Sequence, residues 1–91
     1  MNLDTLRKKL ENVDRQLLTL IKERQDLSHD IGHFKDELGL GTRDYSQETR
    51  VVNRARELAG ELGLAPEVTE ELFLLLIRSS LTVQEKQRVA S

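Results

Sequence analysis

Cysteine is absent from this chain of 91 residues, and aromatic residues are nearly absent. Without cysteine, disulfide bonds and thiolate-bound metals are excluded. The aromatic residues are Phe34, Tyr45 and Phe73, too few for the stacking platforms that bind single-stranded nucleic acid. No apolar run approaches the roughly 20 residues that span a bilayer. The N-terminus also lacks the apolar segment of a secretion signal. We therefore expect a cytoplasmic protein that does not engage a membrane.

The chain also has no large excess of positive or of negative charge. A third of the residues are charged, yet the formal net charge is only −2. The chain therefore lacks the basic surface typical of nucleic-acid binding. This balance does not exclude a small anionic ligand, because a few buried cations can bind one whatever the net charge. The length suffices for one domain, which we expect to span residues 1–91.

The pattern of apolar residues, glycine and proline predicts an all-α fold with one long and two shorter helices. No stretch shows the period-2 alternation of a strand. The first helix is expected from Leu3 to Leu38, before Gly39-Leu40-Gly41. The second runs from about Tyr45 to Leu62 and stops at Gly63, and the third runs from Pro66 to about Arg88.

The first helix carries a long heptad seam, in which apolar residues alternate at spacings of three and four. The seam consists of Leu3, Leu6, Leu10, Val13, Leu17, Leu20, Leu27, Ile31, Phe34 and Leu38. A helix of this length extends about 54 Å, whereas a compact globule of this size has a radius of gyration of about 12 Å. Two shorter helices cannot cover such a seam, so we infer a homodimer with intertwined long helices. An extended helical hairpin, or a fragment of a larger protein, is the alternative.

The two shorter helices show weaker signals. Asp44 is the predicted N-cap of the second helix, with Gln47 as its partner in a capping box. The residues expected to be buried are Val51, Ala55, Leu58 and Leu62 in the second helix, and Leu72, Phe73, Leu76, Ile77 and Leu81 in the third.

One position interrupts the seam, because Arg24 stands where an apolar residue is expected. A buried cation needs a partner, so Arg24 either binds an anionic ligand, sets the register of a dimer, or extends its charge to solvent. Lys35 follows eleven residues later, which places it on nearly the same face about 16 Å away. Arg7 lies about 100° off that face, so it could serve the same pocket only from a partner's helix.

Other polar residues share helix faces at i and i+4. Ser80 and Gln84 continue the apolar row of Phe73 and Ile77. Asp44 and Glu48 form a similar pair, which a helix N-terminus would also favour without any functional role. His29 and His33 have the spacing of metal ligands but no clear third ligand, so we expect two solvated histidines and no metal site.

Taken together, these residues resemble the all-helical class of chorismate mutases over essentially the whole chain. The segments that carry the resemblance are Leu6-Arg7 to Val13-Asp14, Leu17-Leu18 to Glu23-Arg24, Ile31 to Lys35, Arg43-Asp44 to Gln47-Glu48, and Leu72-Phe73 to Ser80 and Gln84. The resemblance implies conversion of chorismate to prephenate, in the biosynthesis of phenylalanine and tyrosine, by a homodimer with shared active sites and no cofactor.

The resemblance also implies roles for the anomalous polar residues. Arg24 would bind one substrate carboxylate, with support from Ser80, and the partner's Arg7 would bind the other. Lys35 and Gln84 would donate to the ether oxygen. The ring hydroxyl would be held by Glu48 and the region of Asp44.

One departure leaves related functions open. The family usually has arginine at the position of Gln47. The alternatives on the same fold are isochorismate-pyruvate lyase and 4-amino-4-deoxychorismate mutase, which use similar carboxylate clamps. An alternative of a different class is a non-catalytic dimerisation module, in which Arg24 would only set the register.

Overall fold

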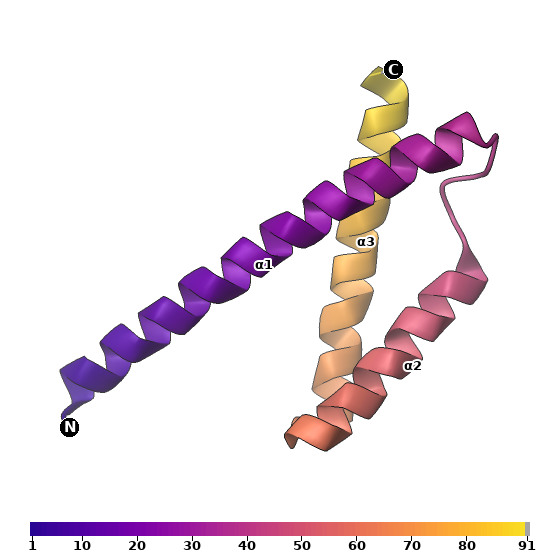
Figure 1. Ribbon diagram of the computed structural model, residues 1–91. Coiled ribbons are helices and arrows are strands. Elements are labelled where there is room, and N and C mark those ends of the chain that lie inside the picture. Colours follow the sequence, from indigo (N-terminus) through magenta and orange to yellow (C-terminus); the bar gives the residue numbers. More distant parts are fainter. Residues whose placement is uncertain (91) are drawn as a thin grey trace.

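The computed structural model describes residues 1–90, which form three helices and no strand (Figure 1). Helix α1 spans Leu3–Glu37, α2 spans Tyr45–Leu62 and α3 spans Pro66–Ala90. The predicted all-α fold is confirmed, and each helix boundary lies within two residues of its expected position. None of these helices is both long enough and apolar enough to cross a membrane.

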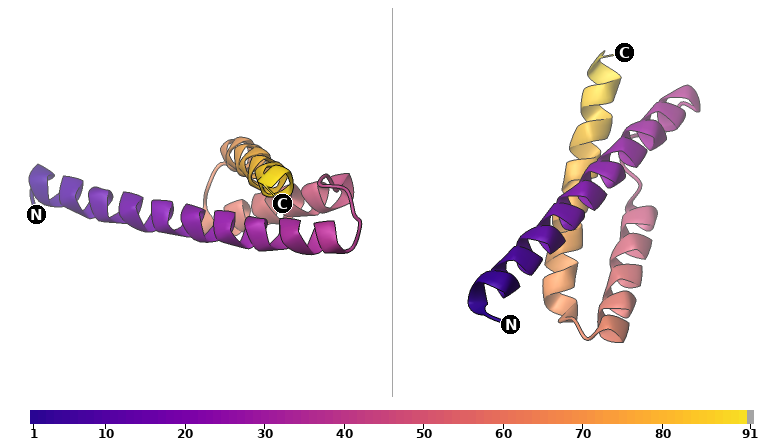
Figure 2. Two further views of the ribbon diagram at one scale, coloured as in Figure 1. Left: turned by 90° about the horizontal axis from the view of Figure 1, so that it is seen from above. Right: turned by 60° about the vertical axis from the view of Figure 1, so that its left-hand side comes forward.

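The helices form an open arrangement rather than a compact globule. Helix α3 packs against both other helices, crossing the C-terminal half of α1 and lying beside α2 (Figures 1 and 2). The N-terminal half of α1 extends beyond this body, so the chain measures 55 × 27 × 14 Å. Its radius of gyration is 16.3 Å, against the roughly 12 Å expected of a compact chain this long.

Short-range signals start and stop the helices. The Asn2 side chain caps α1 by accepting from the backbone N–H of Thr5. Asp44 caps α2 in the same way, since its carboxylate accepts from the backbone N–H of Gln47 at 3.1 Å. Gly63 ends α2 with φ of 74°, a left-handed conformation that favours glycine.

The second half of the predicted capping box is not found. The Oε1 atom of Gln47 accepts from Nε of Arg50 at 3.0 Å, so this side chain turns along α2 rather than back toward the Asp44 backbone. The arginine one turn ahead offers a charged donor, which gives a stronger hydrogen bond than a backbone amide.

Few apolar residues are buried between the helices, and those of α2 are both alanines. Ala55 and Ala59 of α2 are buried, as is Ile77 of α3. Three predictions are therefore wrong for the single chain, because Leu58, Leu62 and Leu72 are exposed. Alanines spaced four residues apart let the α2 backbone approach α3 closely, and this turns the neighbouring leucines toward the outside.

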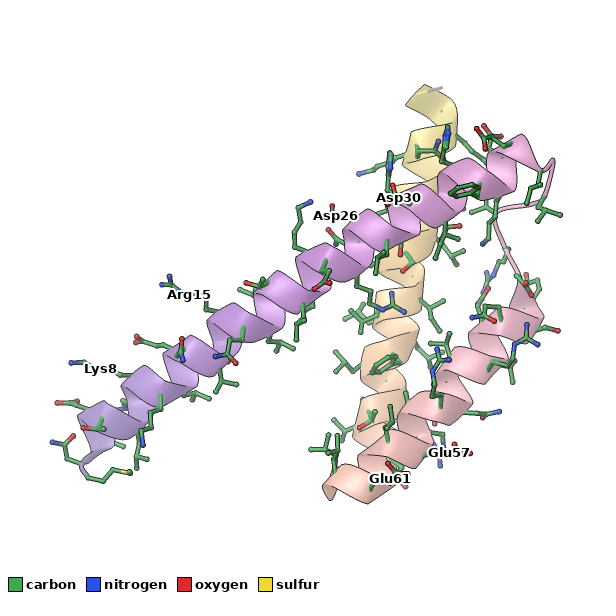
Figure 3. All side chains as sticks on the ribbon, viewed as in Figure 1. Lys8, Arg15, Asp26, Asp30, Glu57 and Glu61 are labelled. Carbon is green, nitrogen blue, oxygen red and sulfur yellow. The ribbon has the colours of Figure 1, made fainter. Side chains whose placement is uncertain are left out.

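The apolar seam of α1 has little cover within the chain. Its first six members are between 49% and 61% exposed, and these are Leu3, Leu6, Leu10, Val13, Leu17 and Leu20. Charged side chains such as Lys8, Arg15 and Asp26 project from another face of the helix, away from α2 (Figure 3). The helix is thus amphipathic over a length that no other described part of the chain covers, and exposed apolar surface of this extent marks an interaction site.

Candidate active site

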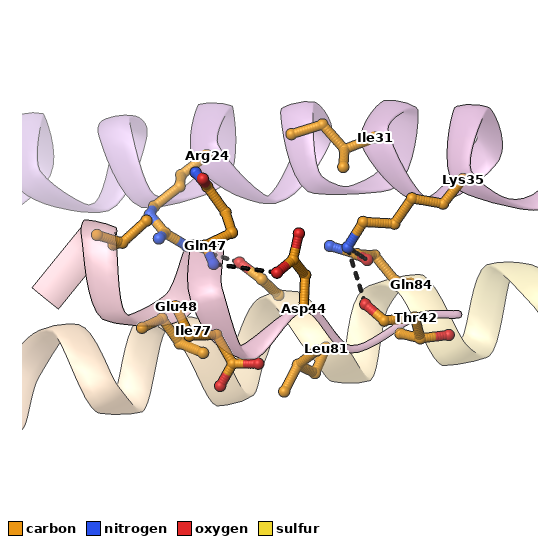
Figure 4. Close-up of a pocket in the computed structure, with 12 residues that line it drawn as sticks. Arg24, Ile31, Lys35, Thr42, Asp44, Gln47, Glu48, Ile77, Leu81 and Gln84 are labelled. Carbon is orange, nitrogen blue, oxygen red and sulfur yellow. Dashed lines mark hydrogen bonds between the residues drawn. The ribbon is translucent and has the colours of Figure 1, made fainter. Parts of the chain in front are cut away.

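A cavity of about 350 Å³ lies where the C-terminal half of α1 faces the start of α2 and the second half of α3 (Figure 4). Every residue predicted for the site lines it except Arg7. The lining residues are Arg24, Ile31, Lys35, Thr42, Asp44, Gln47, Glu48, Val51, Ile77, Ser80, Leu81 and Gln84. The polar interruptions on three separate helices therefore converge on one space.

Arg24 reaches the cavity from α1 and is held by α3. Its Nη1 atom donates to Ser80 Oγ at 2.6 Å and to the carbonyl oxygen of Leu76 at 3.2 Å. The hydroxyl of Ser28 also donates to Ser80 Oγ, at 2.8 Å. Partial burial lowers the pKa of the Arg24 guanidinium from its usual value, although an arginine remains charged throughout the physiological range. Arg24 is therefore a cation held in place by α3 at the wall of the cavity.

Lys35 lies on the same side of the cavity, as the eleven-residue spacing predicts (Figure 4). Its Nζ atom donates to Gln84 Oε1 at 3.0 Å and to the carbonyl oxygen of Thr42 at 2.8 Å. An ammonium group has only donors, so it must face the oxygen of the Gln84 amide. This orients the amide and leaves its NH₂ group as a fixed donor, beside the third N–H of Lys35.

The crossing of α1 and α3 places Gln84 unusually close to α1. Gln84 and Gly32 are both buried. A Cβ atom built on Gly32 would lie 2.9 Å from Cγ of Gln84 and 3.3 Å from its Cα. Only glycine lets the two helices approach this closely, so Gly32 helps to position the amide within reach of Lys35.

The opposite side of the cavity is acidic and belongs to the first turn of α2. Asp44 and Glu48 line it (Figure 4). Glu48 accepts two hydrogen bonds from Arg43, from Nε at 3.1 Å and from Nη2 at 2.9 Å. These hydrogen bonds raise the pKa of the Arg43 guanidinium. The site therefore has a cationic wall from α1 and an acidic wall from α2, which suits a ligand with both carboxylate and hydroxyl groups.

The lining residues suit binding and orientation rather than covalent chemistry. They include no histidine or cysteine, so the cavity lacks the pairing of a base with a nucleophile that acyl transfer needs. His33 pairs instead with Glu37 at 3.2 Å, and His29 approaches Asp30 at 3.8 Å. Within residues 1–90 no cluster of metal-ligating side chains is found. The cavity instead offers fixed hydrogen-bond donors. Such donors stabilise negative charge that develops on a ligand oxygen.

Arg7 lies apart from this cavity. It is exposed on the N-terminal half of α1, the part that extends away from the other two helices (Figure 1). Within one chain it cannot reach the other predicted site residues.

Three contributors were not predicted from the sequence. Ser28 and Thr42 act through a hydroxyl and a backbone carbonyl, and neither leaves a pattern in a sequence. Arg43 offered a signal, because it directly precedes the N-cap and stands five residues before Glu48. That spacing allows a side chain just outside a helix to reach its first turn.

Fold and cavity together define a small all-helical protein whose pocket places two cations, Arg24 and Lys35, opposite two carboxylates, Asp44 and Glu48. The chorismate mutase type II family matches residues 6–85. The chain belongs to this family, and it is an isomerase. This outcome sets aside the non-catalytic dimerisation module.

Known relatives agree with this membership. The chain is 30% identical over 81 residues to a chorismate mutase from Methanocaldococcus jannaschii, which covers 89% of this chain and 82% of the relative. It is 34% identical over 77 residues to an intracellular chorismate mutase from Mycobacterium tuberculosis, which covers 84% of this chain and 66% of the relative. Another match is the T-protein of Enterobacter agglomerans, 30% identical over 80 residues, which cover 88% of this chain but only 21% of that protein.

A solved structure has a similar fold. It is a conserved hypothetical protein from Pyrococcus furiosus, with a TM-score of 0.71 and 33% sequence identity. The match covers 90% of this chain and 93% of that one. The open three-helix arrangement is therefore not peculiar to this chain.

Proposed function

We propose that this protein converts chorismate to prephenate, the rearrangement that supplies phenylalanine and tyrosine biosynthesis. The observation that supports it most is the convergence of Arg24, Lys35 and Gln84 on one cavity, in a chain of the chorismate mutase type II family. Chorismate carries two carboxylates, an ether oxygen and a ring hydroxyl. The cavity of one chain has a complementary side chain for one carboxylate, for the ether oxygen and for the ring hydroxyl.

The cationic wall would bind the ether side of the substrate. Arg24 forms an ion pair with one carboxylate, and Ser80 supports the same group because a hydroxyl that accepts twice still has its hydrogen to donate. Lys35 and the NH₂ group of Gln84 donate to the ether oxygen. Their mutual hydrogen bond fixes both donors before the substrate arrives.

The acidic wall would hold the ring. Glu48 accepts a hydrogen bond from the ring hydroxyl, with Asp44 beside it. These carboxylates also repel the carboxylates of the substrate, so they favour the orientation in which both anionic groups face the cations. One wall thus attracts the anionic groups and the other selects their direction.

The chemistry needs no more than this. The rearrangement is concerted, so no proton moves and no covalent enzyme intermediate forms. The protein must hold the enolpyruvyl ether folded over the ring and stabilise the charge that develops as the C–O bond breaks. An acceleration of about a million-fold corresponds to about 8 kcal/mol. Two or three fixed donors, each worth roughly 3 kcal/mol, together with the orientation of the substrate, reach that scale.

The second substrate carboxylate lacks a cation within one chain, and we propose that the partner subunit supplies it. The exposed seam of α1 has the length and spacing to bind a second copy as an intertwined dimer. Arg7 lies on this seam-bearing half of α1, turned away from the Arg24–Lys35 face. In the dimer it would enter the partner's cavity. A cytoplasmic location completes the proposal, in line with the relative that is named intracellular.

The direct test adds chorismate to the purified protein and follows both the loss of its absorbance and the formation of prephenate. We expect turnover by the wild type and its near loss in Lys35→Ala. The control is Lys86→Ala, which removes an exposed lysine of α3 outside the cavity and should retain activity. Formation of pyruvate and salicylate from isochorismate, with no turnover of chorismate, would overturn the proposal. Analytical ultracentrifugation should give about twice the chain mass of 10.5 kDa.

A further inference from the structure

The loop between α1 and α2 contacts two residues of the proposed site through neighbouring positions. The carbonyl oxygen of Thr42 accepts from Nζ of Lys35 at 2.8 Å. The next side chain, that of Arg43, binds Glu48 through two hydrogen bonds. Consecutive loop residues therefore hold one group of the cationic wall and one group of the acidic wall.

The pairing of Arg43 with Glu48 differs from an ordinary surface ion pair. It is bidentate, and one guanidinium engages both carboxylate oxygens at 2.9 and 3.1 Å. The guanidinium also lies over the ring of Tyr45, 4.5 Å from the ring centre. The two partners differ in exposure. The Arg43 side chain is 53% exposed and the Glu48 side chain only 19%. Arg43 thus holds, from the more exposed side of the pair, the carboxylate of a residue that lines the cavity.

Two consequences follow for Glu48. A carboxylate has about four lone-pair positions, so two hydrogen bonds from Arg43 leave acceptor capacity for a ligand while restricting the rotation of the group. The cation also lowers the repulsion that Glu48 and Asp44 would exert on a doubly anionic substrate. Without Arg43 the carboxylate would be free to rotate, and the acidic wall would carry more uncompensated charge.

We propose that Arg43 is a positioning residue, which orients and neutralises Glu48 so that it can accept a hydrogen bond from the substrate's ring hydroxyl. The proposal rests on the function proposed above. Arg43 itself does not line the cavity, so we expect it to act on the substrate mainly through Glu48. Because the Arg43 side chain is half-exposed, solvent screens the contribution of the pair to stability, and the effect should appear in activity more than in folding.

Steady-state kinetics of single and double variants test this. Arg43→Ala should lower kcat/KM for chorismate about tenfold, mainly by raising KM, because the ring hydroxyl is held in the ground state and the transition state alike. Arg43→Lys keeps the charge but loses the paired geometry, so it should recover part of the loss. In a Glu48→Gln background, Arg43→Ala should have little further effect.

Arg54→Ala is the matched control, since it removes an exposed arginine that lies in α2 and, like Arg43, does not line the cavity. It should leave kcat/KM and the thermal midpoint unchanged. The proposal is overturned if Arg43→Ala costs as much with Gln at position 48 as with Glu, or if its loss of activity follows a loss of thermal stability that Arg43→Lys does not restore.

A spectroscopic measurement separates this proposal from the proposed function. In a ¹H–¹⁵N spectrum of the wild type, the Nε–H of Arg43 should be protected from exchange, and Glu48→Gln should shift its resonance and remove that protection. If the wild type does not turn over chorismate but the Nε–H of Arg43 is protected, the proposed function is wrong and the pairing of Arg43 with Glu48 is still supported. If the wild type turns over chorismate but the Nε–H of Arg43 is not protected, the positioning role of Arg43 is wrong and the proposed function is still supported.

Discussion

Replacing Gly32 by alanine tests whether the close crossing of α1 and α3 positions Gln84. The new Cβ would lie 2.9 Å from Cγ, 3.1 Å from Cβ and 3.3 Å from Cα of Gln84. Because Cα belongs to the backbone, a rotamer change alone cannot relieve the contact. Helix α3 must move by a few tenths of an ångström, and the Gln84 amide must move with it.

Two effects on stability oppose each other in this variant. Alanine in place of glycine inside a helix contributes about 1 kcal/mol in favour of folding. Overpacking of a close contact costs about 1–3 kcal/mol. We therefore expect Gly32→Ala to range from neutral to about 2 kcal/mol destabilised, and to lose activity at least tenfold through the displaced amide.

The control is another helical glycine of the same chain. A Cβ on Gly60 of α2 meets no atom within 4 Å, so Gly60→Ala should show the favourable propensity alone, with unchanged activity. Urea unfolding at matched protein concentration and chorismate kinetics measure both quantities. If Gly32→Ala is as active and as stabilised as Gly60→Ala, the crossing does not constrain Gln84 and the reasoning is refuted.

Three further substitutions examine other walls of the cavity. Gln84→Glu should be nearly inactive near neutral pH, because an ionised carboxylate cannot donate, and should regain part of its activity as the pH falls toward the reference carboxyl pKa of about 4.3; a flat pH profile would remove Gln84 from the ether-oxygen role. Gln47→Arg should raise kcat/KM for chorismate by adding a cation to the cavity, whereas a fall accompanied by a gain for an amino-substituted analogue would favour the related mutase. Ser80→Ala should raise KM and cost about 1–3 kcal/mol in urea unfolding, since it leaves Arg24 without its hydroxyl partner; wild-type values for both would contradict the support that we assign to Ser80.

The long helix and the polar residues that face its neighbours were predictable because both depend on periodicity. A heptad repeat specifies which residues share a face, so Arg24 stood out as an interruption and Lys35 followed from the angle between the two. The N-cap at Asp44 was predictable for a similar reason, since it depends on residues within four positions of each other.

Burial in the shorter helices was harder to predict. Ala55 is buried as predicted, but Leu58 and Leu62, which follow the same expected spacing, are exposed, and the structure buries Ala59 in their place. Side-chain size decides which stripe of a helix can approach another backbone closely, and spacing alone does not report the distance between two helices. The predicted hydrogen bond from the Gln47 side chain to the Asp44 backbone was wrong for a related reason. Arg50 offers a competing hydrogen bond nearby, and only the three-dimensional geometry decides between the two.

Contacts made through the backbone left no signal in the sequence. The carbonyl of Thr42 that binds Lys35 depends on the path of the loop, and any residue type would supply it. The close approach at Gly32 shows in the sequence only as a glycine inside a helix, because a sequence pattern does not report how near a second helix lies.

Complementation between two inactive variants tests the central claim most directly, that two chains share each active site. Arg7→Ala and Lys35→Ala are unfolded together, mixed in equal amounts and refolded. In a mixed dimer one cavity collects both defects, while the other receives an intact Arg7 and an intact Lys35 from different chains. Random pairing makes about half of the dimers mixed, so roughly a quarter of wild-type activity should return. Activity that stays at the level of the two parents would contradict the shared site.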